Sequence, residues 1–159
     1  MKSRRFALVH MGTDVMHGME FIAAEVLKTG HQIQWFDGDE EDAINGILNY
    51  EPHFACFSPL TTFFGHSVRL AGKIKKEDAR IRSVFGGVHV MAVPDIIRHD
   101  DIDIIAQGPV FNAIEKIINS NVSEIIKGEL DPLNEIMPAQ GEKARKYFLE
   151  TIALNKVRY

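Results

Sequence analysis

The 159-residue chain lacks features that would each point to a particular class of protein. It has a single cysteine, Cys56, which excludes an internal disulfide and a cysteine cluster for zinc or iron–sulfur within these residues. No apolar run approaches the roughly 20 residues of a membrane span. The apolar stretch after the basic N-terminus, Phe6–Val9, is too short for a signal-peptide core. We therefore expect a cytoplasmic protein that does not associate with membranes.

An excess of basic residues is also missing. Lys and Arg total 18 against 22 Asp and Glu, a net charge of −4, which disfavours nucleic acid as a partner. The chain is 45% hydrophobic and 25% charged, as globular domains are, and its length suits one α/β domain. Cys56 lies in an apolar run, which favours a buried, inert thiol over a nucleophile. The acidic run 37–42 favours a solvated loop, because the alternating spacing of oxygen ligands is missing.

What the chain does have is a regular alternation of short apolar runs with helical patterns. Five runs are typical of strands buried on both faces: Phe6–Val9, Ile33–Phe36, Phe54–Phe57, Ile81–Phe85 and Ile102–Ala106. Helical patterns follow them, over about 18–28, from Asp39 as N-cap to Leu48, over about 65–77, briefly over 94–97, and up to about Asn119.

This alternation predicts a flavodoxin-like (Rossmann-like), doubly wound parallel sheet of five strands in the order 2-1-3-4-5. The predicted domain covers residues 1–120. The pattern weakens after Ser120, so residues 121–159 are expected to form a C-terminal linker or packing arm, with one more helical pattern at Glu142–Leu149.

Ligands of such sheets bind beyond the carboxyl ends of the strands, at the switch in strand order. The segments expected there are His10–Gly18, Ser58–Thr62, Gly86–His89 and Gln107–Val110. They are rich in glycine and small polar residues, which let a ligand approach the backbone and supply orienting hydrogen bonds.

Three other kinds of site do not match these loops. The segment 11–18 has neither Gly-x-Gly-x-x-Gly nor a terminal Gly-Lys-Ser/Thr for binding phosphate, and only Thr13 for the Ser/Thr run of a flavodoxin. A phosphoryl-accepting receiver would need paired acids after the first strand, an Asp ending the third and a Lys ending the fifth. Those strands end at His10, Phe57 and Ala106.

The loops do match one family. Thr13–Leu27 resembles, without a gap, the Gly-Asp-Val-His-Asp-Ile-Gly segment and following helix of cobalamin-dependent methionine synthase and corrinoid proteins. Ser58–Thr62 resembles their Ser-x-Leu-x-Thr loop, and Gly86-Gly87 their Gly-Gly after the fourth strand. In that family these loops flank the buried nucleotide tail of the cofactor.

A closer resemblance is to the N-terminal cobalamin domain of radical S-adenosylmethionine enzymes. It rests on Phe85–Pro94 and on an Asp-x-x-x-x-Gly turn, Asp103–Gly108, and extends over about residues 5–120. The resemblance implies base-off cobalamin bound by Thr13, Asp14, Val15, Met16, His17, Gly18, Ser58, Leu60, Thr62, Gly86, Gly87, Val88, His89, Gln107, Gly108 and Pro109. It also implies a partner, a radical S-adenosylmethionine barrel in cis or in trans. Only that barrel would add S-adenosylmethionine and a [4Fe-4S] cluster, so this chain alone is expected to have no catalytic residues.

Two positions depart from the family pattern. Met16 stands where corrinoid proteins have the His that ligates cobalt from below, and many radical S-adenosylmethionine relatives also lack that His. Met16 is open to three interpretations: a weak thioether ligand, an apolar cap beneath the corrin, or core packing. The neighbouring His17 could ligate cobalt after a small shift of the loop, but the gapless match places it one residue out of phase, which favours a solvent-facing side chain or a hydrogen bond to a corrin amide. The usual Gly-Glu-Gly-Glu turn is replaced by Gly108-Pro109-Val110-Phe111.

Several other candidate residues have structural interpretations as well. Asp14 suits an N-cap as much as a cofactor contact, and Ser58 and Thr62 suit turns. His89 is expected to face the tail slot. Phe63 and Phe64 suit the core more than a cover for a flat ligand.

Two further functions therefore stay open beside cobalamin binding. One is a regulatory or interaction module that keeps the fold without the cofactor. The other is a sensor of small ligands.

Overall fold

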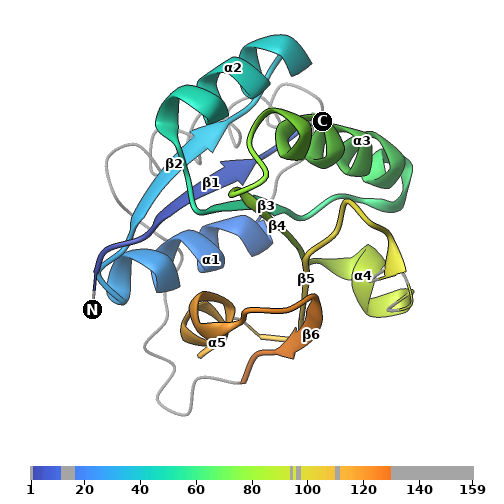
Figure 1. The fold of residues 1–159 in the computed structure, drawn as a ribbon. Coiled ribbons are helices and arrows are strands. Elements are labelled where there is room, and N and C mark those ends of the chain that lie inside the picture. Colours follow the sequence, from blue (N-terminus) through green and yellow to red (C-terminus); the bar gives the residue numbers. More distant parts are fainter. Residues whose placement is uncertain (1, 12–16, 94, 96–97, 110–111, 130–159) are drawn as a thin grey trace, which may run out of the picture.

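The computed structural model describes residues 2–11, 17–93, 95, 98–109 and 112–129. Strands and helices alternate along this part of the chain (Figure 1). In order they are β1 (Arg5–Val9), α1 (His17–Lys28), β2 (Gln32–Phe36), α2 (Glu40–Tyr50), β3 (Phe54–Phe57), α3 (Thr61–Glu77), β4 (Arg82–Phe85), α4 (Val88–Ala92), β5 (Ile104–Gln107), α5 (Ala113–Asn119) and β6 (Glu124–Lys127). No helix among these residues combines the length and the apolarity needed to cross a bilayer.

The strands form one parallel sheet in the order β2-β1-β3-β4-β5-β6. The predicted order of the first five strands is confirmed, and so is the doubly wound α/β class. The prediction of five strands is wrong, because β6 adds a sixth beside β5, within the segment expected to be a linker or packing arm. β6 has only four residues, and Ile126 is the one it buries, so its sequence has little of a strand's apolar pattern.

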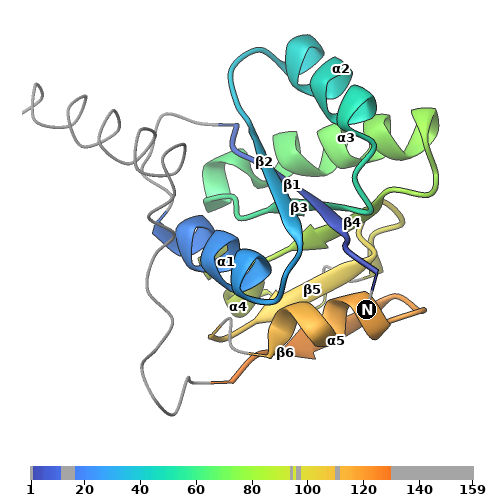
Figure 2. The same ribbon diagram turned by 90° about the vertical axis from the view of Figure 1, so that its left-hand side faces the viewer.

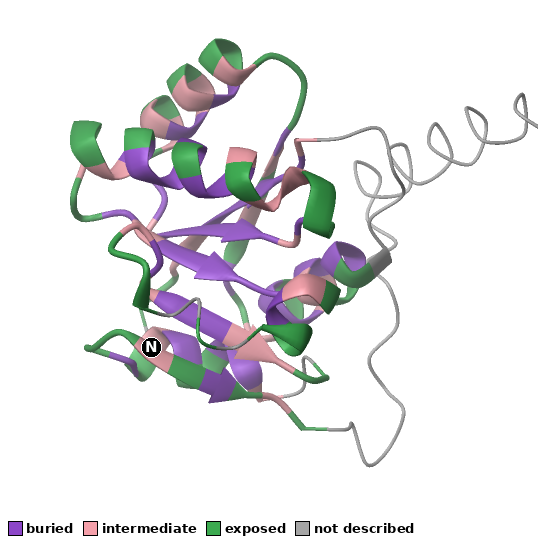
Figure 3. Ribbon diagram, turned by 90° about the vertical axis from the view of Figure 1, so that its right-hand side faces the viewer, coloured by how far each residue is buried: buried purple, intermediate pink, exposed green. Residues whose placement is uncertain are grey.

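Helices cover both faces of the sheet. α2 and α3 lie on one face, and α1 and α5 on the other (Figures 1 and 2). Because side chains alternate along a strand, each strand contributes to two cores. Phe57 and Phe85 point to the α2–α3 face, and their neighbours Cys56 and Val84 point to the α1–α5 face. Figure 3 shows the result, with central strands buried and the outer faces of the helices exposed.

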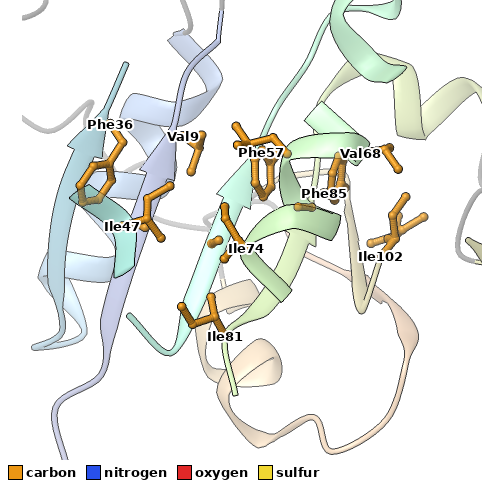
Figure 4. Close-up of a cluster of buried hydrophobic side chains, with 14 of the residues drawn as sticks. Val9, Phe36, Ile47, Phe57, Val68, Ile74, Ile81, Phe85 and Ile102 are labelled. Atoms are coloured by element: carbon orange, nitrogen blue, oxygen red, sulfur yellow. The ribbon is translucent and has the colours of Figure 1, made fainter. Parts of the chain in front are cut away.

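Aromatic stacking organises the core on the α2–α3 face (Figure 4). The rings of Phe57 and Phe85 are stacked with their centroids 4.8 Å apart, and both side chains are almost fully buried. Phe64 meets Phe85 edge-on at 5.9 Å. Phe64 therefore packs against the core, as its sequence context favours.

Local signals explain where several helices begin and end. Asp39 caps α2 by accepting a hydrogen bond from the Glu41 amide at 2.8 Å, as predicted. Gly30, at φ 80°, follows the end of α1 in the left-handed conformation that glycine favours. α3 begins at Thr61, four residues before the predicted start, and α4 begins at Val88 directly after Gly87, where the sequence predicted no helix. The short helix predicted over 94–97 falls on a segment in which only Asp95 is among the described residues.

Long-range hydrogen bonds connect the amino ends of the strands to neighbouring segments. The backbone amides of Arg4 and Arg5 donate to Nδ1 of His31 and His53, each at 3.2 Å. The guanidinium of Arg82, at the start of β4, donates to the carbonyl oxygens of Ser120 and Val122, the latter at 2.8 Å. Arg82 therefore fastens the turn between α5 and β6.

The two histidines predict a dependence of stability on pH. Burial is the main cause lowering the pKa of both, and nearby positive charge, chiefly Arg4, lowers it further; Glu115 partly opposes this at His31. An unprotonated Nδ1 is also needed to accept the amide bonds. As the pH falls through about 6.5, the unfolded chain therefore binds protons first. The stabilising contribution is complete above that pH and is lost below it.

We expect urea unfolding to give a lower free energy at about pH 5.5 than at about pH 7.5, on either side of the ordinary histidine pKa. The double variant His31→Asn/His53→Asn keeps an acceptor at each position but does not titrate there. It should lose less stability over the same interval. An equal loss in the variant and the parent would contradict the assignment.

Candidate functional site

A pocket of about 370 Å³ opens at the carboxyl ends of β3, β4 and β5. It lies on the α1–α5 face, where α1 and α5 flank the sheet. Its floor is formed by side chains that point to this face, Cys56 from β3, Val84 from β4 and Ala106 from β5. The volume falls in the range of about 300–1,000 Å³ that is usual for small-molecule sites.

The loops that the sequence singled out meet at this pocket. Eight of the predicted site residues line it: Gly18, Ser58, Gly86, Gly87, Val88, Gln107, Gly108 and Pro109. They come from α1 and from the segments that follow β3, β4 and β5. The topology therefore brings together residues that are up to 91 positions apart, between Gly18 and Pro109.

Three predicted residues do not line the pocket. Leu60 is 40% exposed and Thr62 is exposed, both outside it. His89, expected to face the slot, lies elsewhere: its Nδ1 is 3.1 Å from the Thr61 hydroxyl, and its ring packs on Phe64 with centroids 4.2 Å apart. The reason is that α4 already begins at Val88, which turns the next side chain toward the start of α3.

Thr13, Asp14, Val15 and Met16 lie outside the described residues, and so does the side chain of His17. The predictions for a cobalt ligand and for Asp14 therefore stay predictions. Within the described part of the chain, no three His, Cys, Asp or Glu side chains are grouped so as to hold a metal ion.

Sequence reasoning missed most of the pocket's side walls, because it considered loops alone. The walls come from the helices α1, α4 and α5: Phe21, Ile22, Met91, Ala113, Ile114 and Ile117. Val84 and Ala106 of the floor were missed as well. Ile114 and Ile117 are three residues apart and therefore lie on one face of α5. This spacing is the sequence signal that could have identified them as lining residues. Glu129, beyond the end of β6, was also missed.

The lining is mainly apolar, with its polar groups in less buried positions. Glu129 is exposed, and the Lys116 ammonium at 2.7 Å and the Asn112 amide at 3.2 Å hold its pKa below the usual range. Gln107 donates from Nε2 to the Val90 carbonyl oxygen at 3.2 Å. Deeper in, burial raises the pKa of the Cys56 thiol to about 12. Apart from Cys56, Glu129 is the only ionisable residue among those that the structure shows lining the pocket.

Gly87 shapes the pocket through the absence of a side chain. Its φ of 86° and ψ of −173° belong to a region that only glycine adopts readily. A Cβ there would also lie 2.5 Å from the Ser58 hydroxyl oxygen. Gly86, next to it, is buried with the carbonyl oxygen of Ala106 at 3.5 Å from where its Cβ would be. The Gly-Gly pair thus lets the backbone after β4 pass close to the Ser58 loop.

The comparisons with known proteins assign no family. No protein-family model and no curated protein sequence matches the chain. Among solved structures, NtrX from Brucella abortus, crystallised in complex with ADP, is similar with a TM-score of 0.43 and 13% identity. The match covers 99% of this chain and 28% of that one, and a likeness this distant says nothing about function. Fold and site define the class: a doubly wound α/β domain with an apolar pocket at the carboxyl ends of its strands.

Replacement of Gly87 by alanine should destabilise the domain. The strained conformation alone costs about 1–3 kcal/mol in a residue with a Cβ, and the contact with Ser58 adds to it. The matched control is Gly18→Ala, because a Cβ at Gly18 meets nothing within 4 Å. Denaturant titration should give a clear loss for the first variant and a change within about 1 kcal/mol for the second. Equal stability of the two variants would contradict the role of Gly87.

Cys56 should be inert in the folded protein. It is 3% exposed, and its raised pKa leaves almost no thiolate near neutral pH. We expect no alkylation by iodoacetamide under native conditions and complete alkylation in concentrated urea, as followed by intact mass. Rapid modification of the native protein would show that the pocket floor is open to the reagent.

Proposed function

We propose that this chain binds cobalamin in the base-off form, with the nucleotide tail of the cofactor in the pocket on the α1–α5 face. The observation that carries the proposal is the convergence of Ser58, Gly86-Gly87 and Gln107–Pro109 on one pocket. These are the segments whose motifs resemble the tail-binding loops of cobalamin domains.

The pocket suits a flat, largely apolar group. Its floor and walls are mainly apolar, and the lack of a side chain at Gly87 lets the backbone lie close to the Ser58 hydroxyl. Ser58 is the residue best placed to donate a hydrogen bond to a polar atom of the tail. Burial of an aromatic base against such walls is favourable by about 25 cal/mol per Å² of apolar surface.

Exposed apolar side chains at the mouth suit the corrin ring. Val88 is 65% exposed and Met91 58% exposed, and both also line the pocket. Leu60, at the end of the β3 loop, is 40% exposed. A macrocycle lying over this rim would remove these side chains from water.

Cobalamin would supply the chemistry of its cobalt centre, including methyl transfer, when it is bound. The chain's own part is to bind and orient the cofactor. The wider proposal is the cofactor domain of a radical S-adenosylmethionine methyltransferase-like enzyme, whose partner barrel would carry S-adenosylmethionine and the iron–sulfur cluster.

Titration with hydroxocobalamin tests the proposal. We expect a change in the visible absorption bands on binding and a rise in melting temperature. At about one hundred times Kd, linkage adds about 2.7 kcal/mol to the free energy of unfolding, which corresponds to a rise of several degrees for a domain of this size.

A matched pair of variants identifies the pocket as the site. Ala106→Phe places a large ring where the small side chain of Ala106 lines the pocket. Ala79→Phe makes the same change at an exposed position in the turn before β4, at the opposite edge of the sheet. The first variant should lose cobalamin binding and the second should keep it. A folded parent chain that binds no corrinoid would instead support the cofactor-free interaction module.

A further inference from the structure

We infer that the pocket selects a corrinoid by the polarity of its lower base, accepting a benzimidazole or a phenol and rejecting a purine. This inference rests on the proposed function and names the class of ligand for the same site. Its basis is the distribution of polar groups with depth in the pocket.

The most buried lining residues offer almost no hydrogen bonds. Val84, Ile114 and Ile117 are 1–4% exposed and purely aliphatic. Cys56, 3% exposed, is a neutral thiol, which is a weak donor and a weak acceptor. The backbone amides and carbonyls of β3 and β4 are also used in sheet hydrogen bonds. β3 pairs with β1 and β4, and β4 pairs with β3 and β5, in parallel ladders.

The polar side chains of the lining are shallower, and two of them, Gln107 and Glu129, already have hydrogen-bond partners. Ser58 and Gln107 are half-buried, and Glu129 is exposed. The amide of Gln107 donates to Val90, and the carboxylate of Glu129 is held by Lys116 and Asn112. None of these groups therefore satisfies a base that has passed beyond them to the aliphatic floor.

Purine bases and the benzimidazole or phenol bases differ in how many polar atoms they would bury at the pocket floor. Adenine has several ring nitrogens and an exocyclic amine, and each loses its water when the base is buried. A polar group buried without a partner is penalised heavily. 5,6-Dimethylbenzimidazole has a single free ring nitrogen and two methyl groups, and p-cresol has no ring nitrogen. The described walls therefore favour the last two bases.

The test is titration of the whole chain with corrinoids that share the ring and differ in the base. We expect the dimethylbenzimidazolyl and p-cresolyl forms to bind with similar Kd. The adeninyl form should bind more weakly by roughly tenfold or more, about the cost of one buried unpaired group. Cobinamide, which has no base, should bind more weakly than the dimethylbenzimidazolyl form.

The outcomes separate this inference from the proposal on which it rests. If the adeninyl form binds within about threefold of the dimethylbenzimidazolyl form, the selectivity is absent although the chain is a cobalamin domain. If none of the corrinoids binds, the proposed function itself fails.

A variant tests where the selectivity arises. Val84→Thr keeps the shape of the side chain and places a hydroxyl on the pocket floor. It should improve binding of the adeninyl form and so reduce the ratio of its Kd to that of the dimethylbenzimidazolyl form. Val68→Thr makes the same change at a similarly buried residue of the opposite core and should leave the ratio unchanged. A ratio unaffected by Val84→Thr in the folded protein would overturn the assignment of the selectivity to the pocket floor.

Discussion

The structure depends on the burial of both faces of a single parallel sheet. Strands of four or five residues supply side chains alternately to two separate cores, so Cys56 and Phe57, or Val84 and Phe85, serve opposite faces although they are neighbours in the chain. On the α2–α3 face, stacked aromatic rings fill the space. On the other face, smaller residues such as Ala106 and Ala113 lie near the strand ends, and there the two helices leave room for the pocket.

Much of this arrangement could be predicted from the sequence. Phe54–Phe57 was predicted with the bounds that the structure has, and Asp39 was identified as a cap, because burial on both faces and N-capping depend on neighbouring residues alone. β6 could not be predicted in this way. Only one of its side chains is buried, and it is a strand because β5 offers it an edge to pair with, which is a long-range effect.

In the site, too, features that depend on neighbouring residues could be predicted and features that depend on long-range packing could not. Glycine and small polar residues identified the loops after β3, β4 and β5, because the need for close approach of the backbone is a local property. The orientation of His89 depends on α4, which begins at Val88, and the sequence pattern did not predict a helix there. The walls contributed by α1 and α5 follow from how two helices pack on one face, and loop composition carries no information about that.

Arg82 links the amino end of β4 to segments that line the pocket. It stands at the amino end of β4, two residues before the pocket-lining Val84, and it donates hydrogen bonds to the carbonyl oxygens of Ser120 and Val122 in the turn that joins α5 to β6. α5 supplies one side of the cavity, and the chain leaving β6 supplies Glu129 at its rim. These hydrogen bonds therefore help to fix the positions of two segments, α5 and the chain after β6, that both contribute residues to the pocket.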